Sequence, residues 1–425
     1  MKLLVVTSVS PLQNNLRIEY VQTILEQLRK KTDTKIIWLV NQPDHIETSD
    51  TEFESIRDFH EFSNGLDAIN TIKPDIILVS LWTDTIQYSI SLAANSLQIP
   101  IISFVGAKLH STRKLEKVSY NIRRRFFSNS VPTDSTEKKQ FLRRGRFQLS
   151  KFLFSFKTRL ATNMGFFKSI KSIIDEIFLY VLSKQLSPNP FPSYYLLHNN
   201  SEIKSLIDLN LPSEKLIVVG NPLLDFIKKK SFEYNYVKKN SNTIKLLIVT
   251  DSLYQHGVWS LKQRDIFFNN LFDKLTKNKN IYFDFKIHPG SENKDYYEKI
   301  ISKFNVKSKV FQSEVLWSII DQYDITLTYG MSTAHTEISC SGMRMIKIYD
   351  IDALLPDFPL VEEGILSGHI RACDDLNDLM PMIFDFMKIE PKLSSNFIEA
   401  RKQLFHNRDG NAAKRIADIM LKELN

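Results

Sequence analysis

Short runs of consecutive apolar residues alternate along the chain with stretches of helical periodicity. A continuous apolar run is typical of a strand that is buried on both faces of a sheet. In the first half of the chain, the runs predict strands at residues 3–6, 35–40, 76–79, 100–105, 194–197 and 216–219. In the second half they predict strands at residues 245–249, 282–287, 325–328 and 345–349. Buried strands separated by helices predict an α/β protein with parallel, doubly wound sheets.

Helical spacing of apolar residues predicts helices between these strands, at residues 18–28, 89–97, 201–209, 266–275, 296–304, 316–321, 332–341 and 412–424. Residues 235–242 are polar and rich in lysine, which is typical of a linker between domains. The pattern therefore predicts two Rossmann-like domains, at residues 1–240 and 241–405, and a C-terminal helix at 406–425.

One segment departs from this alternation. Residues 108–171 hold seventeen basic and three acidic residues, a net charge of +14, whereas the whole chain is +8 and the remainder is therefore −6. Phenylalanines are interleaved with the basic residues. We expect a basic helical insertion at about 112–190 in the first domain.

Three interpretations of this insertion remain open: a solvated loop, a surface for single-stranded nucleic acid, and a surface that docks on an anionic membrane. Nucleic acid is the least favoured partner, because the rest of the chain contains no known nucleic-acid-binding module. If the partner is a membrane, we expect it to contact Arg123, Arg124, Arg125, Phe126, Phe127, Arg143, Arg144 and Arg146.

Composition and motifs exclude several other classes of protein. The only cysteines are Cys340 and Cys373, and no CxxC occurs, so a disulfide framework is not expected and a reducing compartment is. The N-terminal apolar run is too short for a signal sequence, and no run is long enough to span a bilayer. We therefore expect a cytoplasmic protein, peripheral on the inner face of the membrane. The chain has no P-loop, no GxGxxG after the first strand, no HExxH and no GxSxG.

Ligands of such α/β proteins bind at the carboxyl ends of the strands, so the residues that follow each strand are candidates. The strongest junction is 328–337 (TYGMSTAHTE), where a strand leads through Gly330 into a helix. Ser332 or Thr333 would begin that helix, whose amides could bind a phosphate, and Glu337 could accept hydrogen bonds from ribose hydroxyls. The alternative is that Ser332 and Thr333 only cap the helix and that Glu337 is solvated.

Two further junctions of the second domain point to the same edge. His288 ends one predicted strand and Pro289 fixes the backbone after it, so His288 could donate to a phosphate or to a leaving oxygen. Thr250 and Asp251 follow the first strand of that domain. A purely structural role is the alternative for each of these residues.

The first domain offers two junctions. Asp84 follows the strand at 76–79, where it could act as a general base or could cap the next helix. Gly220, Asn221 and Pro222 make a sharp turn after the strand at 216–219, and they suit either a hinge between domains or an ordinary turn.

Four stretches together resemble a known superfamily: 74–111, 216–225 (LIVVGNPLLD), 286–289 (KIHP) and 313–348. They resemble GT-B glycosyltransferases of the group that includes bacterial UDP-N-acetylglucosamine 2-epimerases, CDP-glycerol glycerophosphotransferases, and bacterial sialyl- and Kdo-transferases. The resemblance implies two Rossmann-like domains that face a cleft, with the nucleotide-sugar donor bound by the second. It implies that His288 and Pro289 contact the nucleotide, Ser332 and Thr333 its phosphate, and Glu337 its ribose.

Departures from the epimerase pattern favour a transferase. Gly106 stands where the epimerases have a glutamate, and Thr-Asp-Ser-Leu at 250–253 stands where they have His-Arg-x-Glu. We therefore expect a glycosyltransferase that uses a CMP- or UDP-sugar and a glycan or lipid-linked acceptor in cell-surface glycan synthesis. His288 would stabilise the departing phosphate and Asp84 would activate the acceptor, with no metal or other cofactor. The alternatives are a hydrolysing UDP-N-acetylglucosamine 2-epimerase and a non-catalytic nucleotide-sugar or glycan binding protein.

Overall fold

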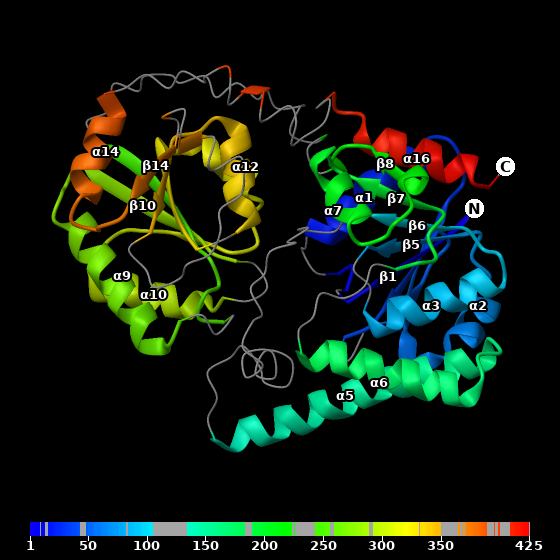
Figure 1. Cartoon of the computed structure of the whole chain (residues 1–425). Helices are drawn as coiled ribbons and strands as arrows, with labels where there is room; N and C mark the ends of the chain where they lie inside the picture. The colour runs from blue at the N-terminus through cyan, green and yellow to red at the C-terminus, as the bar shows by residue number, and fades with distance from the viewer. Residues whose placement is uncertain are drawn as a thin grey trace. The chain divides into compact units, whose positions relative to one another are not determined.

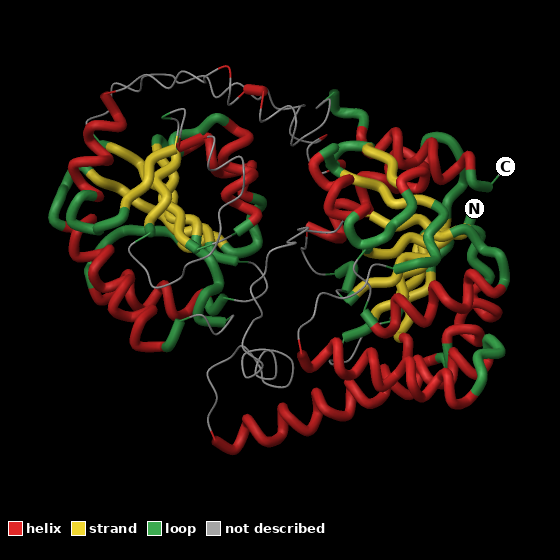
Figure 2. Tube along the Cα trace, viewed as in Figure 1, coloured by secondary structure: helices red, strands yellow, loops and turns green. Residues whose placement is uncertain are grey.

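The computed structural model describes the chain except for residues 9, 13–15, 43–47, 82–83, 105–133, 183–188, 223–224, 226–242, 256–258, 289–291, 331, 350–363, 366–367, 369, 389–394, 396–397, 400–408 and 425. It divides into two compact units, Met1–Phe226 with Phe405–Asn425, and Ile227–Leu404. In each unit the strands are enclosed by helices (Figure 2). The boundary expected at residue 240 lies outside the described residues.

The first unit is built on an eight-stranded sheet in the order β3-β4-β2-β1-β5-β6-β7-β8. Figure 1 labels β1, β5, β6, β7 and β8 of this sheet. All neighbouring strands pair in parallel except β3 with β4, which are antiparallel. The strands are β1 (Lys2–Thr7), β2 (Lys35–Val40), β3 (Ser49–Asp50), β4 (Glu54–Asp58), β5 (Ile76–Ser80), β6 (Ile101–Phe104), β7 (Tyr194–Leu197) and β8 (Leu216–Val218).

Helices cover both faces of this sheet, which is why its central strands are apolar throughout. On β1, Leu3 and Val5 pack on one side with α1 and α16, whereas Leu4 and Val6 pack on the other with α2, α3 and α5. The helices of this unit are α1 (Leu16–Arg29), α2 (Gly65–Ile72), α3 (Thr85–Ser96), α5 (Asp134–Ala161), α6 (Phe166–Leu182), α7 (Ser201–Ile207) and α16 (Ala412–Lys422). Short 3-10 helices lie at Phe59–Glu61 and Ser213–Lys215.

The C-terminal helix α16 belongs to the first unit, although the second unit precedes it in the chain. It packs against α1, and its residues Ile416, Ala417 and Met420 are buried in the same core as β1. Asp225 accepts hydrogen bonds from the backbone amides of Ala412 and Ala413, at 3.0 and 2.7 Å. Residues far apart in the sequence thus complete one face of the first sheet.

The described part of the basic insertion is helical. Helices α5 and α6 contact each other, and α5 packs on α2 and α3 (Figure 1). Two of its basic residues are buried in that packing: Lys151 pairs with Asp84, and Arg159 pairs with Glu176 at 2.9 Å. The helical insertion is confirmed for Asp134–Leu182, where the solvated-loop interpretation therefore does not hold.

The second unit has a six-stranded, fully parallel sheet in the order β11-β10-β9-β12-β13-β14. Its strands are β9 (Ile244–Val249), β10 (Ile281–Lys286), β11 (Val310–Phe311), β12 (Ile325–Tyr329), β13 (Met345–Ile348) and β14 (Ile370–Cys373). Its helices are α9 (Leu261–Thr276), α10 (Lys294–Lys303), α11 (Leu316–Ile319), α12 (Thr333–Ser341) and α14 (Leu379–Lys388), with a 3-10 helix at Ile320–Gln322. The expectation of two parallel-sheet α/β domains is confirmed.

Candidate functional site

The register of the second sheet brings most of the expected donor-site residues to one edge. Strand β9 lies between β10 and β12, and Val249 is level with Lys286 on one side and with Thr328 on the other. The residues that follow these strands therefore emerge together: Thr250 and Asp251 after β9, His288 after β10, and Gly330 and Ser332 after β12. This edge is the carboxyl end of a parallel sheet, where ligands of α/β proteins bind.

Gly330 and Asp251 meet at the centre of this edge. Gly330 has a φ of +66°, and a Cβ placed on it would clash with Oδ2 of Asp251. Both the left-handed backbone and the contact with a buried carboxylate therefore require glycine. As a result, the chain turns sharply between β12 and α12.

Helix α12 begins directly after this turn. The Ser332 hydroxyl accepts a hydrogen bond from the Ala334 amide at 3.3 Å, so Ser332 is the N-cap. A cap satisfies only part of the four amides at a helix start, so capping and anion binding are compatible. Thr333 is the first residue of the helix, and its side chain lies outside the described part.

Two fully buried side chains, Lys347 and His335, pack beneath the turn at Gly330. The Lys347 ammonium on β13 donates to the Gly330 carbonyl oxygen and lies 3.1 Å from Nδ1 of His335 on α12. This contact fixes the direction of the Gly330 carbonyl, and it places a positive charge behind the start of α12. The sequence pattern did not single out either residue. For Lys347 a signal was present, because an ionisable residue inside an apolar strand is rare unless it has partners.

A second group missed from the sequence centres on Glu292, just after His288. Its buried carboxylate accepts hydrogen bonds from the Thr250 and Tyr297 hydroxyls, and from the His288 amide at 2.7 Å. Glu292 thus ties the ends of β9 and β10 to α10. Burial raises the pKa of Glu292, although these hydrogen bonds oppose the shift. The buried Thr250 hydroxyl donates to Glu292, so Thr250 has a structural role at this edge of the sheet.

The pKa of the His288 imidazole is lowered by its surroundings. Desolvation by its surroundings, and then the positive charge of Lys286, lower the pKa of His288. The buried Lys286 ammonium donates to the carbonyl oxygens of Ile287 and Gln312, each at 3.0 Å. Burial lowers the pKa of Lys286, and the carboxylates of Glu314, Glu337 and Glu292 oppose that shift. The half-buried Glu337 is thus electrostatically coupled to the end of β10. Pro289 lies outside the described residues.

In the first unit, Asp84 is the N-cap of α3. Its carboxylate accepts hydrogen bonds from the Gln87 amide, the Asn41 side chain and the Lys151 ammonium, at 2.9, 2.9 and 3.0 Å. Burial would raise the pKa of Asp84, but the Lys151 charge and these hydrogen bonds outweigh it and the pKa is lowered. A carboxylate with a lowered pKa is a weak base. The structure thus favours the capping alternative, and the base role stays a prediction.

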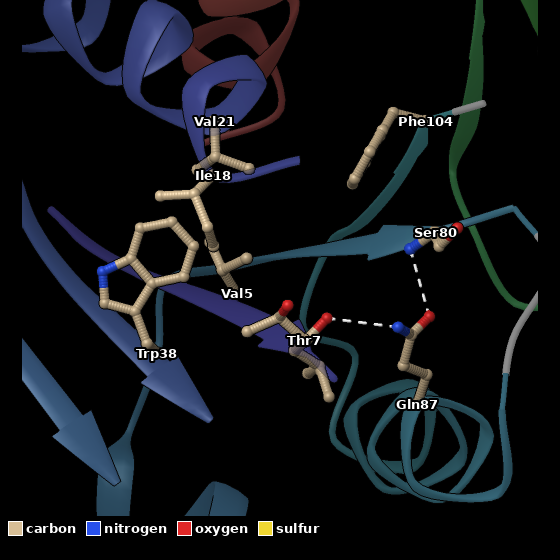
Figure 3. A pocket seen from close by; sticks show the side chains of 9 residues that line it. Val5, Thr7, Ile18, Val21, Trp38, Ser80, Gln87 and Phe104 are labelled. Carbon is tan, nitrogen blue, oxygen red and sulfur yellow. Dashed lines mark hydrogen bonds between the residues drawn. The ribbon is translucent and has the colours of Figure 1, made fainter. Parts of the chain in front are cut away.

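A small cavity lies inside the first unit, close to the end of β1 (Figure 3). Its volume is about 20 Å³, which suffices for about one water molecule and not for a sugar ring. The Gln87 side chain lines it and bridges two strands, because it donates to the Val6 carbonyl and accepts from the Ser80 amide, each at 3.2 Å. This bridge belongs to the packing of α3 on the sheet.

The other expected residues divide between turn and surface. Gly220 has a φ of +88° and donates to the Leu197 carbonyl at 3.3 Å, so it makes the expected turn after β8, with Asn221 and Pro222 following. A hinge role for these three residues stays a prediction. Of the expected membrane contacts, Arg146 is exposed on α5. The side chains of Arg143 and Arg144, and all of Arg123, Arg124, Arg125, Phe126 and Phe127, lie outside the described residues.

The described residues lack a membrane-spanning helix and a cluster of metal-binding side chains. No helix there is long and apolar enough to cross a membrane. No three His, Cys, Asp or Glu side chains of the described part gather into a group that could hold a metal ion.

Two parallel-sheet α/β units of this kind define a GT-B-type fold, and comparison with solved structures agrees. The chain is similar to UDP-GlcNAc 2-epimerase from Neisseria meningitidis bound to UDP-GlcNAc, with 15% identity, a TM-score of 0.52, and coverage of 99% of this chain and 100% of the other. It is similar to the glycotransferase of kitacinnamycin, with 13% identity, a TM-score of 0.53, and coverage of 100% and 99%.

The S. aureus MnaA–UDP structure is a third neighbour, with 12% identity, a TM-score of 0.52, and coverage of 100% of this chain and 97% of that one. No family model matches the chain. No curated protein matches it in sequence either. At these identities the likeness shows the fold alone, and the resemblance of fold expected from the sequence is confirmed.

Proposed function

We propose that the protein is a glycosyltransferase that binds a CMP- or UDP-sugar at the carboxyl edge of its second sheet. The observation that carries this proposal is the register of β10, β9 and β12, which gathers Asp251, His288 and the Gly330 turn at one edge. The fold supports it, because neighbours of the same fold include a glycotransferase and proteins bound to UDP-GlcNAc or UDP.

The proposed chemistry uses groups that favour an anion. The start of α12 carries a partial positive charge, and the buried Lys347 ammonium lies behind it. Such fixed charges would bind the donor phosphates and stabilise the negative charge that develops on the leaving nucleotide. The His288 imidazole would donate a hydrogen bond to the same phosphates. Glu337 would accept hydrogen bonds from the ribose hydroxyls of the donor.

The proposal includes a role in cell-surface glycan synthesis, with a glycan or lipid-linked acceptor, and a cytoplasmic location at the inner face of the membrane. The support is the basic helical insertion of the first unit, whose Arg146 is exposed on α5. A protein that builds on a lipid-linked acceptor gains from being held at the membrane, since the acceptor is confined there.

A second candidate, a hydrolysing UDP-GlcNAc 2-epimerase, is favoured by one observation. Proteins of that name are among the neighbours that match the whole chain with a TM-score above 0.5. Against it stand Gly106 and the Thr250–Leu253 stretch, which depart from the epimerase pattern. A non-catalytic binding protein of the same fold is the remaining alternative.

A panel of CMP-, UDP- and GDP-sugars tests the donor site by thermal unfolding. Saturation at about one hundred times Kd stabilises a protein by about 2.7 kcal/mol, so we expect a rise in Tm of roughly 5–10 °C with a CMP- or UDP-sugar. The His288→Gln variant should reduce that rise, whereas the matched control His60→Gln, on the first unit, should not. Absence of any nucleotide-dependent shift contradicts the proposal.

Product analysis then separates the three candidates. The protein is incubated with the stabilising donor, with and without a membrane extract as the source of acceptor, and the sugar is followed by NMR. A transferase consumes the donor only when acceptor is present, and the sugar then appears in a glycosidic bond to the acceptor. UDP-N-acetylmannosamine or free N-acetylmannosamine identifies an epimerase. Binding without any turnover identifies a binding protein.

A further inference from the structure

The outer face of helix α5 carries leucines in contact with solvent. Leu149, Leu153 and Leu160 are 59%, 50% and 38% exposed. Their spacing of four and seven residues places them on one stripe of the helix. An outward stripe of leucines is unusual on a helix that packs on its own protein, because that face is ordinarily polar.

The opposite face of α5 is fully used inside the first unit. Phe154, Ser155 and Thr158 are buried, and the Thr158 hydroxyl accepts a hydrogen bond from the Gly65 amide of α2 at 2.7 Å. The Phe154 ring packs edge-on against Phe59, with ring centroids 5.6 Å apart. Helix α5 is therefore held in place by one face, and the leucine stripe is a separate surface.

The stripe continues across the turn onto α6. Phe166 and Phe167 begin α6 and are 54% and 85% exposed. The Phe166 ring lies edge-on to Phe156 of α5, with ring centroids 5.9 Å apart, so it joins the two helices. Ile174, about two turns along α6, is 48% exposed. We call Leu149, Leu153, Leu160, Phe166, Phe167 and Ile174 the hairpin face.

Positive charge surrounds this apolar surface. Four exposed basic residues lie on the same two helices: Arg146, Lys157, Lys168 and Lys171. Helices α5 and α6 form a helical hairpin, and its side chains are described for residues 145–176. The acidic residues in that range are Asp175 and Glu176, and Glu176 is paired with Arg159. Leucine and phenylalanine flanked by lysine and arginine form the pattern of an element that lies in the interface of an anionic bilayer.

We propose that the hairpin face is a docking surface for a bilayer of anionic phospholipid, with Phe166 and Phe167 entering the interface and the four basic residues contacting headgroups. This proposal rests on the membrane attachment included in the proposed function, and it assigns that attachment to the hairpin face. It does not depend on the transferase chemistry. A second copy of this chain is the less suitable occupant, because two hairpins would bring like charges together.

Flotation with vesicles tests the proposal on the full chain. Vesicles contain either phosphatidylcholine alone or equal amounts of phosphatidylcholine and phosphatidylglycerol. We expect the protein to float with the anionic vesicles only. The Phe166→Ser/Phe167→Ser variant should bind them at least about tenfold more weakly, since two aromatic side chains no longer enter the interface. Each of Lys168→Gln and Lys171→Gln should weaken binding about fivefold.

The matched control is Leu261→Ser/Lys262→Gln on α9 of the second unit, where Leu261 is 44% exposed and Lys262 is also exposed. This variant should float like the wild type. Circular dichroism and Tm establish that each variant is folded. A Phe167→Trp variant gives a second readout, because its emission should shift to the blue when vesicles are added.

Three results overturn the proposal: no flotation of the wild type, equal flotation with neutral vesicles, or unchanged flotation of the double phenylalanine variant. A dimer in solution that this variant dissociates also overturns it, because the hairpin face would then join two copies. Nucleotide-sugar binding without vesicles is measured on the same variants. Its retention there separates failure of the docking surface from failure of the proposed function.

Discussion

Gly330 shows at the scale of single residues how two independent constraints fix one side chain. Its positive φ disfavours any residue with a Cβ, and the Asp251 carboxylate occupies the space that a Cβ would need. The carbonyl of the same residue is held by the buried Lys347. The shape of the proposed donor edge therefore depends on the buried contacts of Lys347 as well as on the residues at its surface.

A Gly330→Ala substitution separates the two constraints. Left-handed backbone costs a non-glycine residue about 1–2 kcal/mol, and the contact with Asp251 adds to that cost. We expect G330A to lower the free energy of unfolding by about 2–4 kcal/mol, and by only about 1–2 kcal/mol when it is introduced into an Asp251→Ala background. Urea unfolding of the four proteins checks this. Equal losses in both backgrounds would show that the carboxylate does not restrict this position.

The contribution of Asp84 to the free energy of unfolding is expected to depend on pH. The pKa of Asp84 is lowered in the folded protein, so its ionised form stabilises the fold above the ordinary pKa of about 3.8, and that contribution is lost as the pH falls through the lowered value. Asp84→Asn keeps a cap acceptor and loses the pairing with Lys151. We expect D84N to lower the free energy of unfolding by about 2 kcal/mol at pH 7, with the difference from wild type shrinking below pH 3.8.

Turnover of D84N per folded molecule decides between the two roles of Asp84. A general base typically contributes 10²–10⁴ to the rate. From the capping geometry we expect turnover within about tenfold of wild type under conditions where both proteins are folded. A loss of two orders of magnitude or more at unchanged folded fraction would instead establish Asp84 as the base.

Helix α16 shows how an element can depend on a residue far away in sequence. Its N-cap residue, Asn411, makes no side-chain capping hydrogen bond, and Asp225 accepts from the first two helical amides instead. Arg415 of the same helix donates to the Val219 carbonyl at 2.8 Å. The end of β8 and the turn at Gly220 thus lead the chain to the residue that holds α16.

Loss of the Asp225 carboxylate should therefore loosen α16. A capping side chain is worth about 1 kcal/mol, so we expect Asp225→Ala to lower the free energy of unfolding by about 1–2 kcal/mol and to speed hydrogen exchange in α16. Asp225→Asn should cost less, because one acceptor remains. Asp208→Ala, an exposed aspartate at the end of α7, is the control. Unchanged exchange in α16 would contradict a capping role for Asp225.

The whole molecule consists of two units, and each has its own sheet and apolar core. Charge is distributed unevenly between their parts: the segment 108–171 is +14, and the rest of the chain is −6. The positive net charge of the chain therefore comes from one insertion of the first unit. The proposed donor edge belongs to the second unit. We expect the proposed membrane docking and the proposed nucleotide-sugar binding to be separable.

Hydrogen exchange with a bound nucleotide sugar tests that separation. A ligand protects amides that it contacts or whose opening it suppresses. We expect slower exchange at the ends of β9, β10 and β12 and at the start of α12, and no change in α5 and α6. Anionic vesicles should give the reverse pattern. Protection of α5 by the nucleotide sugar would contradict the assignment of the donor to the second unit.

Much of the fold follows from local sequence. The apolar runs at 3–6, 35–40, 245–249 and 325–328 are strands in the structure, because a strand buried on both faces must be apolar along its length. Short or mixed segments were missed, among them β4 and α2. In β4 (ESIRD), polar residues outnumber apolar ones, so no buried run marks it.

Some residues of the candidate site could be found from local sequence, and others could not. Glycine and a capping serine after an apolar strand are local signals, so Gly330 and Ser332 were found. Glu292, His335 and Lys347 act through partners on other strands and helices, and no local pattern reports those partners. The sequence also marked Asp84, and only its contacts with Asn41 and Lys151 distinguished a paired cap from a base.

The sequence by itself thus determined the class of fold, the position of the basic insertion and the strand ends where chemistry is expected, because periodicity and turn residues are local properties. Tertiary structure alone decided that α16 completes the first unit and that Lys151 and Arg159 are buried in it. It also decided that β10, β9 and β12 end side by side, and that leucines of α5 point outward. These depend on which elements pack together, and burial, charge pairing and strand order are defined only once distant segments meet.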